Sequence, residues 1–290
     1  MVLNRPARKG VDCAMLIRSL AKRHILAALI VVGITAVGVR AAGQSSQNSD
    51  PPGGVTAVQP SRPDASGDEI FAELVKQNEL RSARLREYSA VRIYAVTNPE
   101  GKVYAREIVR MEYVAPDKKT FVKTSEEGSP LVRHMVLNGL IETETSTAAG
   151  KEHHDSSITP ANYTFAVVGQ EEVGANHCYV VDVLPKRKDK YLFEGKVWID
   201  SREFAIVRIA GHPAKKLSFW ITRAEFVRQY EKIGDFRLPA KDETFVDVKL
   251  YGKKILTIEH RIDTVNGVKS AASAGQDQNV AWVSEKPKSE

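Results

Sequence analysis

The chain has 290 residues, enough for one sizeable domain with tails, and its formal net charge is +6. Residues 1–41 hold seven basic residues and one acidic residue, which accounts for the whole excess, so the remaining chain carries 35 of each sign. This balance excludes a basic nucleic-acid-binding domain, which needs positive charge on the folded part of the protein.

The first 43 residues are predicted to be an export signal. Basic residues precede an apolar run of 15 residues at 25–39, and the small residues of VRAAG follow it. The run is shorter than the roughly 20 residues of a full membrane span, which favours a cleaved signal peptide. Arg40, directly after the run, is unfavourable for cleavage, so an uncleaved inner-membrane signal-anchor stays open. Both interpretations predict an exported, periplasmic protein.

The next segments predict a tether followed by a helix. Residues 44–66 are rich in Ser, Gln, Pro and Gly and are expected to be disordered. The folded domain is predicted over 67–267. Ser66 and Glu69 have the spacing of a capping box, and the apolar residues that follow recur at helical spacing. We therefore expect one amphipathic helix that packs on a sheet.

After Tyr88 the apolar period becomes two and stays so, which predicts a long series of strands joined by short turns. Short turns make neighbouring strands antiparallel. The segment 130–139 is included among the strands, whereas 139–161 lacks the alternation and predicts one or two short helices over the sheet. The expected fold is mainly β (α+β), an unclosed antiparallel β-barrel with an N-terminal helix and a helical lid. Residues 268–290 are predicted to be a disordered tail.

The hairpin at 190–213 carries the most prominent apolar face. Asp200-Ser201 supplies the turn, and the apolar residues on either side fall in phase. Two interpretations are open: a concave ligand-binding surface, or ordinary core beneath the helices. The residues of this face are Tyr191, Phe193, Val197, Ile199, Phe204 and Ile206.

The sequence shows no arrangement typical of an enzyme or a metal site. His153, His154 and Asp155, with His134 upstream, lack the convergence that a metal site needs. No nucleophile elbow, phosphate loop or zinc-protease motif is present. Cys178 is predicted to be a small buried hydrophobic residue. We expect a binding protein without catalytic residues, metal or cofactor.

The strand pattern resembles the LolA/LolB-like superfamily, which includes lipoprotein carriers and sigma-factor regulators of the RseB/MucB type. The resemblance lies in LREYSAVRIYAV, in YLFEGKVWIDSREFAIVRI and in the closing strands KIGDFRLPAKDETFVDVKLYGKKILTI. It implies a hydrophobic half-barrel cavity for the acyl chains of a lipid or lipoprotein, in a carrier or sorting role. It also implies an arginine that controls the lid, for which Arg92 is the best placed.

An RseB-like regulatory or interaction module, which senses envelope lipids or lipoproteins, is the alternative function. The partners expected from the resemblance are acyl chains and an inner- or outer-membrane protein, with no nucleic acid, and the protein is expected to be a monomer.

Overall fold

The computed structural model describes residues 66–147, 157–189 and 191–271. The predicted export signal, almost all of the tether and most of the tail lie outside these ranges. Within them, no helix is both long enough and apolar enough to cross a membrane.

The first element is the helix α3, Gly67–Arg84, where the sequence predicts it. The Ser66 hydroxyl accepts from the Glu69 backbone N–H, and the Glu69 carboxylate accepts from the Ser66 N–H. This reciprocal capping box satisfies two donors that the first turn would otherwise leave unpaired. Ile70, Phe71 and Leu74 are buried on one face of the helix.

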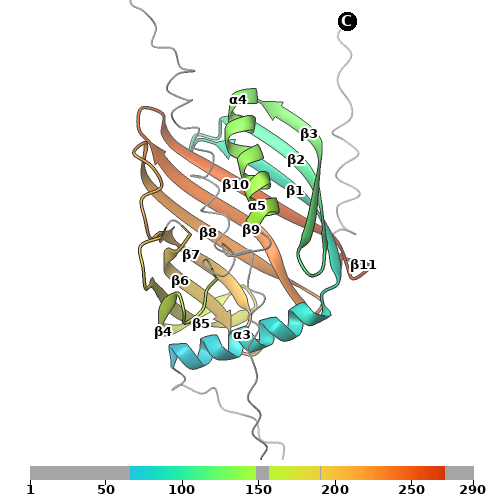
Figure 1. The fold of residues 1–290 in the computed structure, drawn as a ribbon, viewed down its shortest axis with the longest axis vertical. Helices are drawn as coiled ribbons and strands as arrows, with labels where there is room; N and C mark the ends of the chain where they lie inside the picture. Colours follow the sequence, from blue (N-terminus) through green and yellow to red (C-terminus); the bar gives the residue numbers. More distant parts are fainter. Residues whose placement is uncertain (1–65, 148–156, 190, 272–290) are drawn as a thin grey trace, which may run out of the picture.

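The strands form one antiparallel sheet that does not close, which confirms the predicted fold class. The order is β3-β2-β1-β10-β9-β8-β7-β6-β5-β4, so β3 and β4 are the two edges and the short β11 pairs with β10. Figure 1 shows the sheet curled, with α3 along one end. The bounds are β1 Glu87–Thr97, β2 Val103–Val114, β3 Lys118–Gly128, β4 Tyr163–Val173, β5 Asn176–Pro185, β6 Phe193–Asp200, β7 Ile206–Pro213, β8 Ile221–Ile233, β9 Phe236–Val248, β10 Gly252–Val265 and β11 Val268–Lys269.

A helical segment lies against β1–β3 (Figure 1). It consists of α4 Pro130–Val132, the π-helical η1 Arg133–Leu137 and α5 Asn138–Thr147. The expected strand at 130–139 is therefore wrong. Ser129 caps the segment and Pro130 occupies its first turn, where a missing N–H costs nothing.

Two glycines let β6 and β7 approach closely. Gly195 lies opposite Gly211 in the strand register. A Cβ atom added to Gly195 would lie 2.1 Å from the Ala210 carbonyl oxygen, and one added to Gly211 would lie 2.4 Å from the Glu194 oxygen. Neither position can accept a side chain unless the backbone moves.

The inner face of the sheet, which α3 and the helical segment cover, is apolar at both ends. One cluster lies under α3 on β4–β8 and includes Phe71, Tyr163, Phe193, Ile209 and Phe226. A second cluster lies under η1 and α5 and consists of Tyr94, Val96, Ala105, Val109, Leu137, Leu140, Leu256 and Ile258. We call the second cluster the lid core. Burial of these side chains is the main force that holds both helices on the sheet.

Candidate functional site

The structure brings most of the predicted hairpin face together in the cluster under α3. Phe193, Val197 and Ile199 are each 0% exposed, and Ile206 is buried. Phe204 is half-buried against the same cluster, whereas Tyr191 lies half-buried just before β6.

Contacts between aromatic rings cover this face of the hairpin. The Phe71 ring of α3 stacks on Phe165 with 3.6 Å between centroids, and Phe193 meets Phe226 edge-on at 5.5 Å. The arrangement matches the core interpretation of the hairpin. Its use as a ligand face stays a prediction, and it requires α3 to move.

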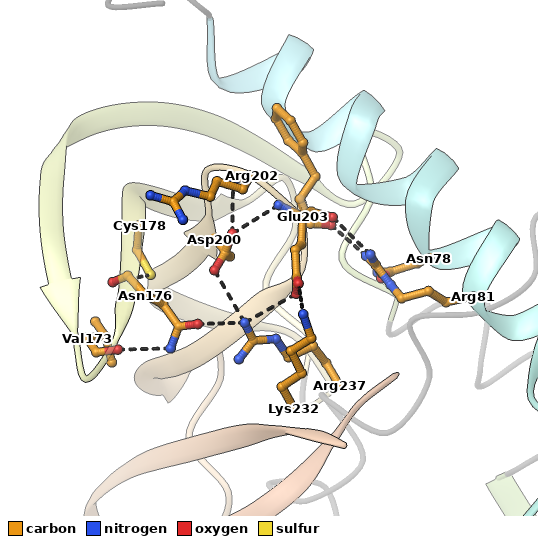
Figure 2. A network of polar contacts seen from close by, with 11 residues as sticks. Asn78, Arg81, Val173, Asn176, Cys178, Asp200, Arg202, Glu203, Lys232 and Arg237 are labelled. Atoms are coloured by element: carbon orange, nitrogen blue, oxygen red, sulfur yellow. Dashed lines mark hydrogen bonds and ion pairs between the residues drawn. The ribbon is translucent and has the colours of Figure 1, made fainter. Parts of the chain in front are cut away.

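A polar network fixes α3 at its C-terminal end (Figure 2). Arg81 donates through Nη1 to the Glu203 carbonyl at 2.9 Å and through Nη2 to the Phe204 carbonyl at 2.6 Å. The Asp200 carboxylate accepts from the backbone N–H groups of Arg202 and Glu203. The predicted turn at Asp200 is therefore confirmed, and it serves as the docking point of the helix.

Arg237 extends this network to β9. Its Nη2 lies 2.6 Å from Asn176 Oδ1 and 3.3 Å from Asp200 Oδ2. Phe204 adopts a left-handed φ of 44°, which is unfavourable for a bulky residue and is held by these contacts. The carboxylates of this network thus have structural partners.

Arg92, predicted as the lid-controlling residue, lies inside the half-barrel and contacts the helical segment. Its side chain is 2% exposed, and Nη1 lies 2.6 Å from Glu144 Oε2 of α5. The other carboxylate oxygen of Glu144 lies 2.9 Å from Lys119 Nζ of β3. We call Arg92, Lys119 and Glu144 the lid latch, because two strands hold one helix through a single buried carboxylate.

The charges of the lid latch determine how Glu144 titrates. Burial alone would raise the pKa of the Glu144 carboxyl. The positive charges of Arg92 and Lys119 outweigh burial and hold that pKa well below its ordinary value. Glu144 is therefore ionised at neutral pH, and the latch is a true ion pair in a water-poor site.

A second buried cluster lies beside the latch, on β8, β9 and β10. Arg228 pairs with the Asp242 carboxylate, and His260 Nε2 donates to Asp242 Oδ2 at 2.9 Å. His260 stands directly opposite Arg92 in the β1–β10 register. We call Arg228, Asp242 and His260 the strand cluster. Together with the lid latch it makes a continuous charged layer between two apolar ends.

The strand cluster also has shifted pKa values. Burial would raise the pKa of Asp242, but Arg228 and His260 lower it to about 2. Burial and the neighbouring Arg92 charge lower the pKa of His260 below its ordinary value of 6.5, although its bond to Asp242 opposes this. His260 is therefore neutral at pH 7.

These shifts predict acid destabilisation in two steps. Between pH 6.5 and the lowered pKa of His260 the unfolded chain binds more protons, so the free energy of unfolding should fall as the pH drops. Below about pH 4.5 the carboxylates of Glu144 and Asp242 add a steeper loss. Urea unfolding at a series of pH values checks this, with His260→Gln expected to remove the first step only. A free energy of unfolding that stays constant from pH 7 to 5 would contradict the His260 assignment.

Cys178, on β5 and outside this layer, is buried, as predicted, and burial raises the pKa of its thiol to about 11. Its thiol is therefore not activated as a nucleophile. His134 lies exposed on η1, whereas His153, His154 and Asp155 lie outside the described residues. Among the residues that the structure describes, no three metal-ligating side chains converge.

Sequence reasoning missed Lys119, Glu144 and the whole strand cluster. The alternation carries a signal for the strand residues, because Arg228 falls in phase with the buried Phe226, and Asp242 with Thr244 and Val246. A charged residue in an inward phase is a sign of a buried ion pair. Glu144 carries a comparable signal, because it continues the spacing of four set by Val136 and Leu140, but it is visible only once this segment is taken as a helix.

Comparison with solved structures finds proteins of the superfamily that the sequence resembles. A domain assigned to outer membrane lipoprotein sorting, from Vibrio parahaemolyticus, matches with 10% identity and a TM-score of 0.40, over 73% of this chain and 97% of that one. A LolA superfamily protein from Nitrosomonas europaea matches with 9% identity and a TM-score of 0.33, over 68% and 92%. The MucA/MucB complex from Pseudomonas aeruginosa gives 9% identity and a TM-score of 0.23, over 66% and 93%.

No family model matches the chain, and no curated protein matches it. At these identities the structural matches concern the arrangement of the strands and not the chemistry of the site.

Proposed function

We propose that this is an exported, non-enzymatic envelope protein that binds the acyl chains of a lipid or lipoprotein between its sheet and its helical segment, in a carrier or sorting role. The observation that carries the proposal is the lid latch. A buried ion pair joins the helical segment to the wall of an unclosed half-barrel, and an apolar surface lies directly beneath that segment.

The contacts of the helical segment with the sheet are those expected of a lid that opens. Leu137 and Leu140 are the residues of the segment that belong to the lid core. Its ion pairs with the sheet include the buried lid latch and a more exposed pair between Arg133 and Glu126. A buried ion pair adds little net stability compared with apolar packing, whereas it specifies one closed position. Such a lid has one defined closed position, and the free energy needed to open it is small.

An acyl chain is a suitable occupant of the lid core. Each CH2 group that leaves water contributes about 0.8 kcal/mol, so an apolar wall of this kind can retain a chain in an aqueous compartment. The sequence resemblance to the LolA/LolB-like superfamily supports the same ligand class. Export to the periplasm, a membrane-protein partner and a monomeric state are part of the proposal. Anchoring at the inner membrane applies only if the N-terminal apolar segment is not cleaved.

A regulatory or interaction module is the second candidate. The burial of the hairpin face beneath α3 favours it. With Phe193, Val197 and Ile199 fully buried, this face is core in the structure. The unpaired edges of β3 and β4 would then be the surfaces that meet a protein.

Native mass spectrometry of the exported protein, purified without detergent, separates the two. We expect an acyl-bearing adduct that an organic wash removes. Leu140→Gln, which weakens the lid core from the helix side, should abolish the adduct, whereas the exposed Leu131→Gln should retain it. A bare polypeptide mass in every preparation would reject the carrier role and favour the interaction module.

A further inference from the structure

Exposed apolar side chains gather at the end of the half-barrel away from α3. Phe219 is 75% exposed and Leu250 is 86% exposed. They lie on neighbouring connections, since the Lys249 N–H donates to the Trp220 carbonyl at 2.9 Å. We call the segments 214–220 and 249–254 the basic rim. In Figure 1 these connections close β7–β8 and β9–β10 at the end opposite α3.

The basic rim is positively charged in a chain that is otherwise balanced. Its 13 residues include five lysines and no acidic residue. Lys102 of the adjacent turn, which also contains Glu100, lies near them, because Lys102 Nζ and Lys254 Nζ lie 5.4 Å and 5.0 Å from the Tyr104 ring. Exposed apolar residues that lysines surround differ from the scattered surface residues that every protein shows.

The aromatic side chains of the rim are ordered by contacts with one another. Phe219 meets Trp220 edge-on at 5.7 Å, and Lys249 Nζ lies 3.5 Å from the Phe219 ring centroid. A groove of about 340 Å³ adjoins the rim along Leu217 and Ile221. The exposed Phe219 ring therefore belongs to a surface ordered by its own contacts and lying beside a groove.

We propose that the basic rim docks on the surface of an anionic lipid bilayer. Aromatic rings and leucine are stable at the level of the headgroups, while lysines around them attract anionic lipid. The rim contains lysine and no arginine, which suits delocalised attraction to a charged surface better than bidentate recognition of one phosphate. This docking goes beyond the proposed function and does not require a ligand under the lid.

Quenching of Trp220 by lipids with brominated acyl chains tests the docking in the full chain. Trp198→Phe and Trp282→Phe leave Trp220 as the only tryptophan, so the signal reports the rim even if the predicted N-terminal apolar run inserts. We expect strong quenching with vesicles of equal parts phosphatidylglycerol and phosphatidylcholine. Vesicles of phosphatidylcholine alone should quench far less, and high salt should weaken the binding.

Substitutions in the rim should change this signal. Lys216→Gln with Lys253→Gln should weaken binding to anionic vesicles about 25-fold, since each lysine near such a surface contributes about fivefold. Phe219→Ser with Leu250→Ser should abolish quenching. Leu184→Ser, at a residue 54% exposed on β5, is the matched control and should change nothing. Absence of quenching, equal quenching by neutral vesicles, or rim variants that behave like the control would each overturn the proposal.

Discussion

Replacing Asp242 with leucine should lower the free energy of unfolding by about 3–5 kcal/mol, because it leaves a buried arginine without its counter-charge. Arg228 and Asp242 stand opposite each other on β8 and β9, and their side chains are 5% and 9% exposed. The Arg228 guanidinium cannot lose its proton in the variant, because the ordinary pKa of arginine lies far above neutral pH. Urea unfolding at pH 7 measures the loss.

The double variant Arg228→Met with Asp242→Leu separates charge from packing. If the loss comes from an unpaired charge, removing Arg228 as well should restore most of the stability, because apolar residues of similar size often replace a buried pair without cost. The remaining loss is that of the hydrogen bond between Asp242 and the buried His260. Glu225→Leu, on the exposed side of β8, should have no measurable effect. A double variant no more stable than Asp242→Leu would show that Arg228 has another role.

The course of the chain through the sheet could be predicted because it depends on local signals. The alternation from Tyr88 onward, the capping box at Ser66 and the turn at Asp200 each act over a few residues, and each appears in the structure where it was expected. Asn266-Gly267 joins β10 to β11, and β11 continues two residues past the predicted end of the domain.

The helical segment shows where the local signal is ambiguous. Val132, Val136 and Leu140 recur at a spacing of four, which predicts a helix, but the flanking strands favoured a period of two. Ser129 and Pro130 were the deciding residues, since a capping hydroxyl before proline marks the start of a helix. Because this start was missed, the lid was predicted to begin nine residues too late.

The site could be predicted only in part, because it joins residues far apart in the chain. Arg92 could be proposed from its strand, but its partner Glu144 lies 52 residues later and Lys119 lies on a third element. No spacing rule links them. The hairpin face was recognised as apolar, yet whether it faced a ligand or α3 depended on where the helix packs.

Replacing Glu144 with leucine should open the lid while the rest of the sheet stays folded. Arg92 and Lys119 would both lose their counter-charge. Lys119, whose pKa burial already lowers, can release its proton, whereas Arg92 stays charged and can be hydrated only if α5 moves away. Backbone amides of residues 130–147 should then exchange with deuterium about 100- to 1,000-fold faster, the factor that corresponds to about 3–4 kcal/mol. Mass spectrometry of peptides from this segment, compared with peptides from β6 and β7, measures the effect.

The triple variant Arg92→Met, Lys119→Met and Glu144→Leu tests what the latch contributes. An apolar latch of similar volume should restore slow exchange, because the desolvation cost of the ions disappears together with their attraction. Its binding of acyl chains should nevertheless differ from that of the natural protein, because closure of the lid no longer depends on an ion pair that can be hydrated. If Glu144→Leu leaves exchange unchanged, the lid is held by the packing of Leu137 and Leu140 and by contacts such as the Arg133–Glu126 pair, and the lid latch does not control opening.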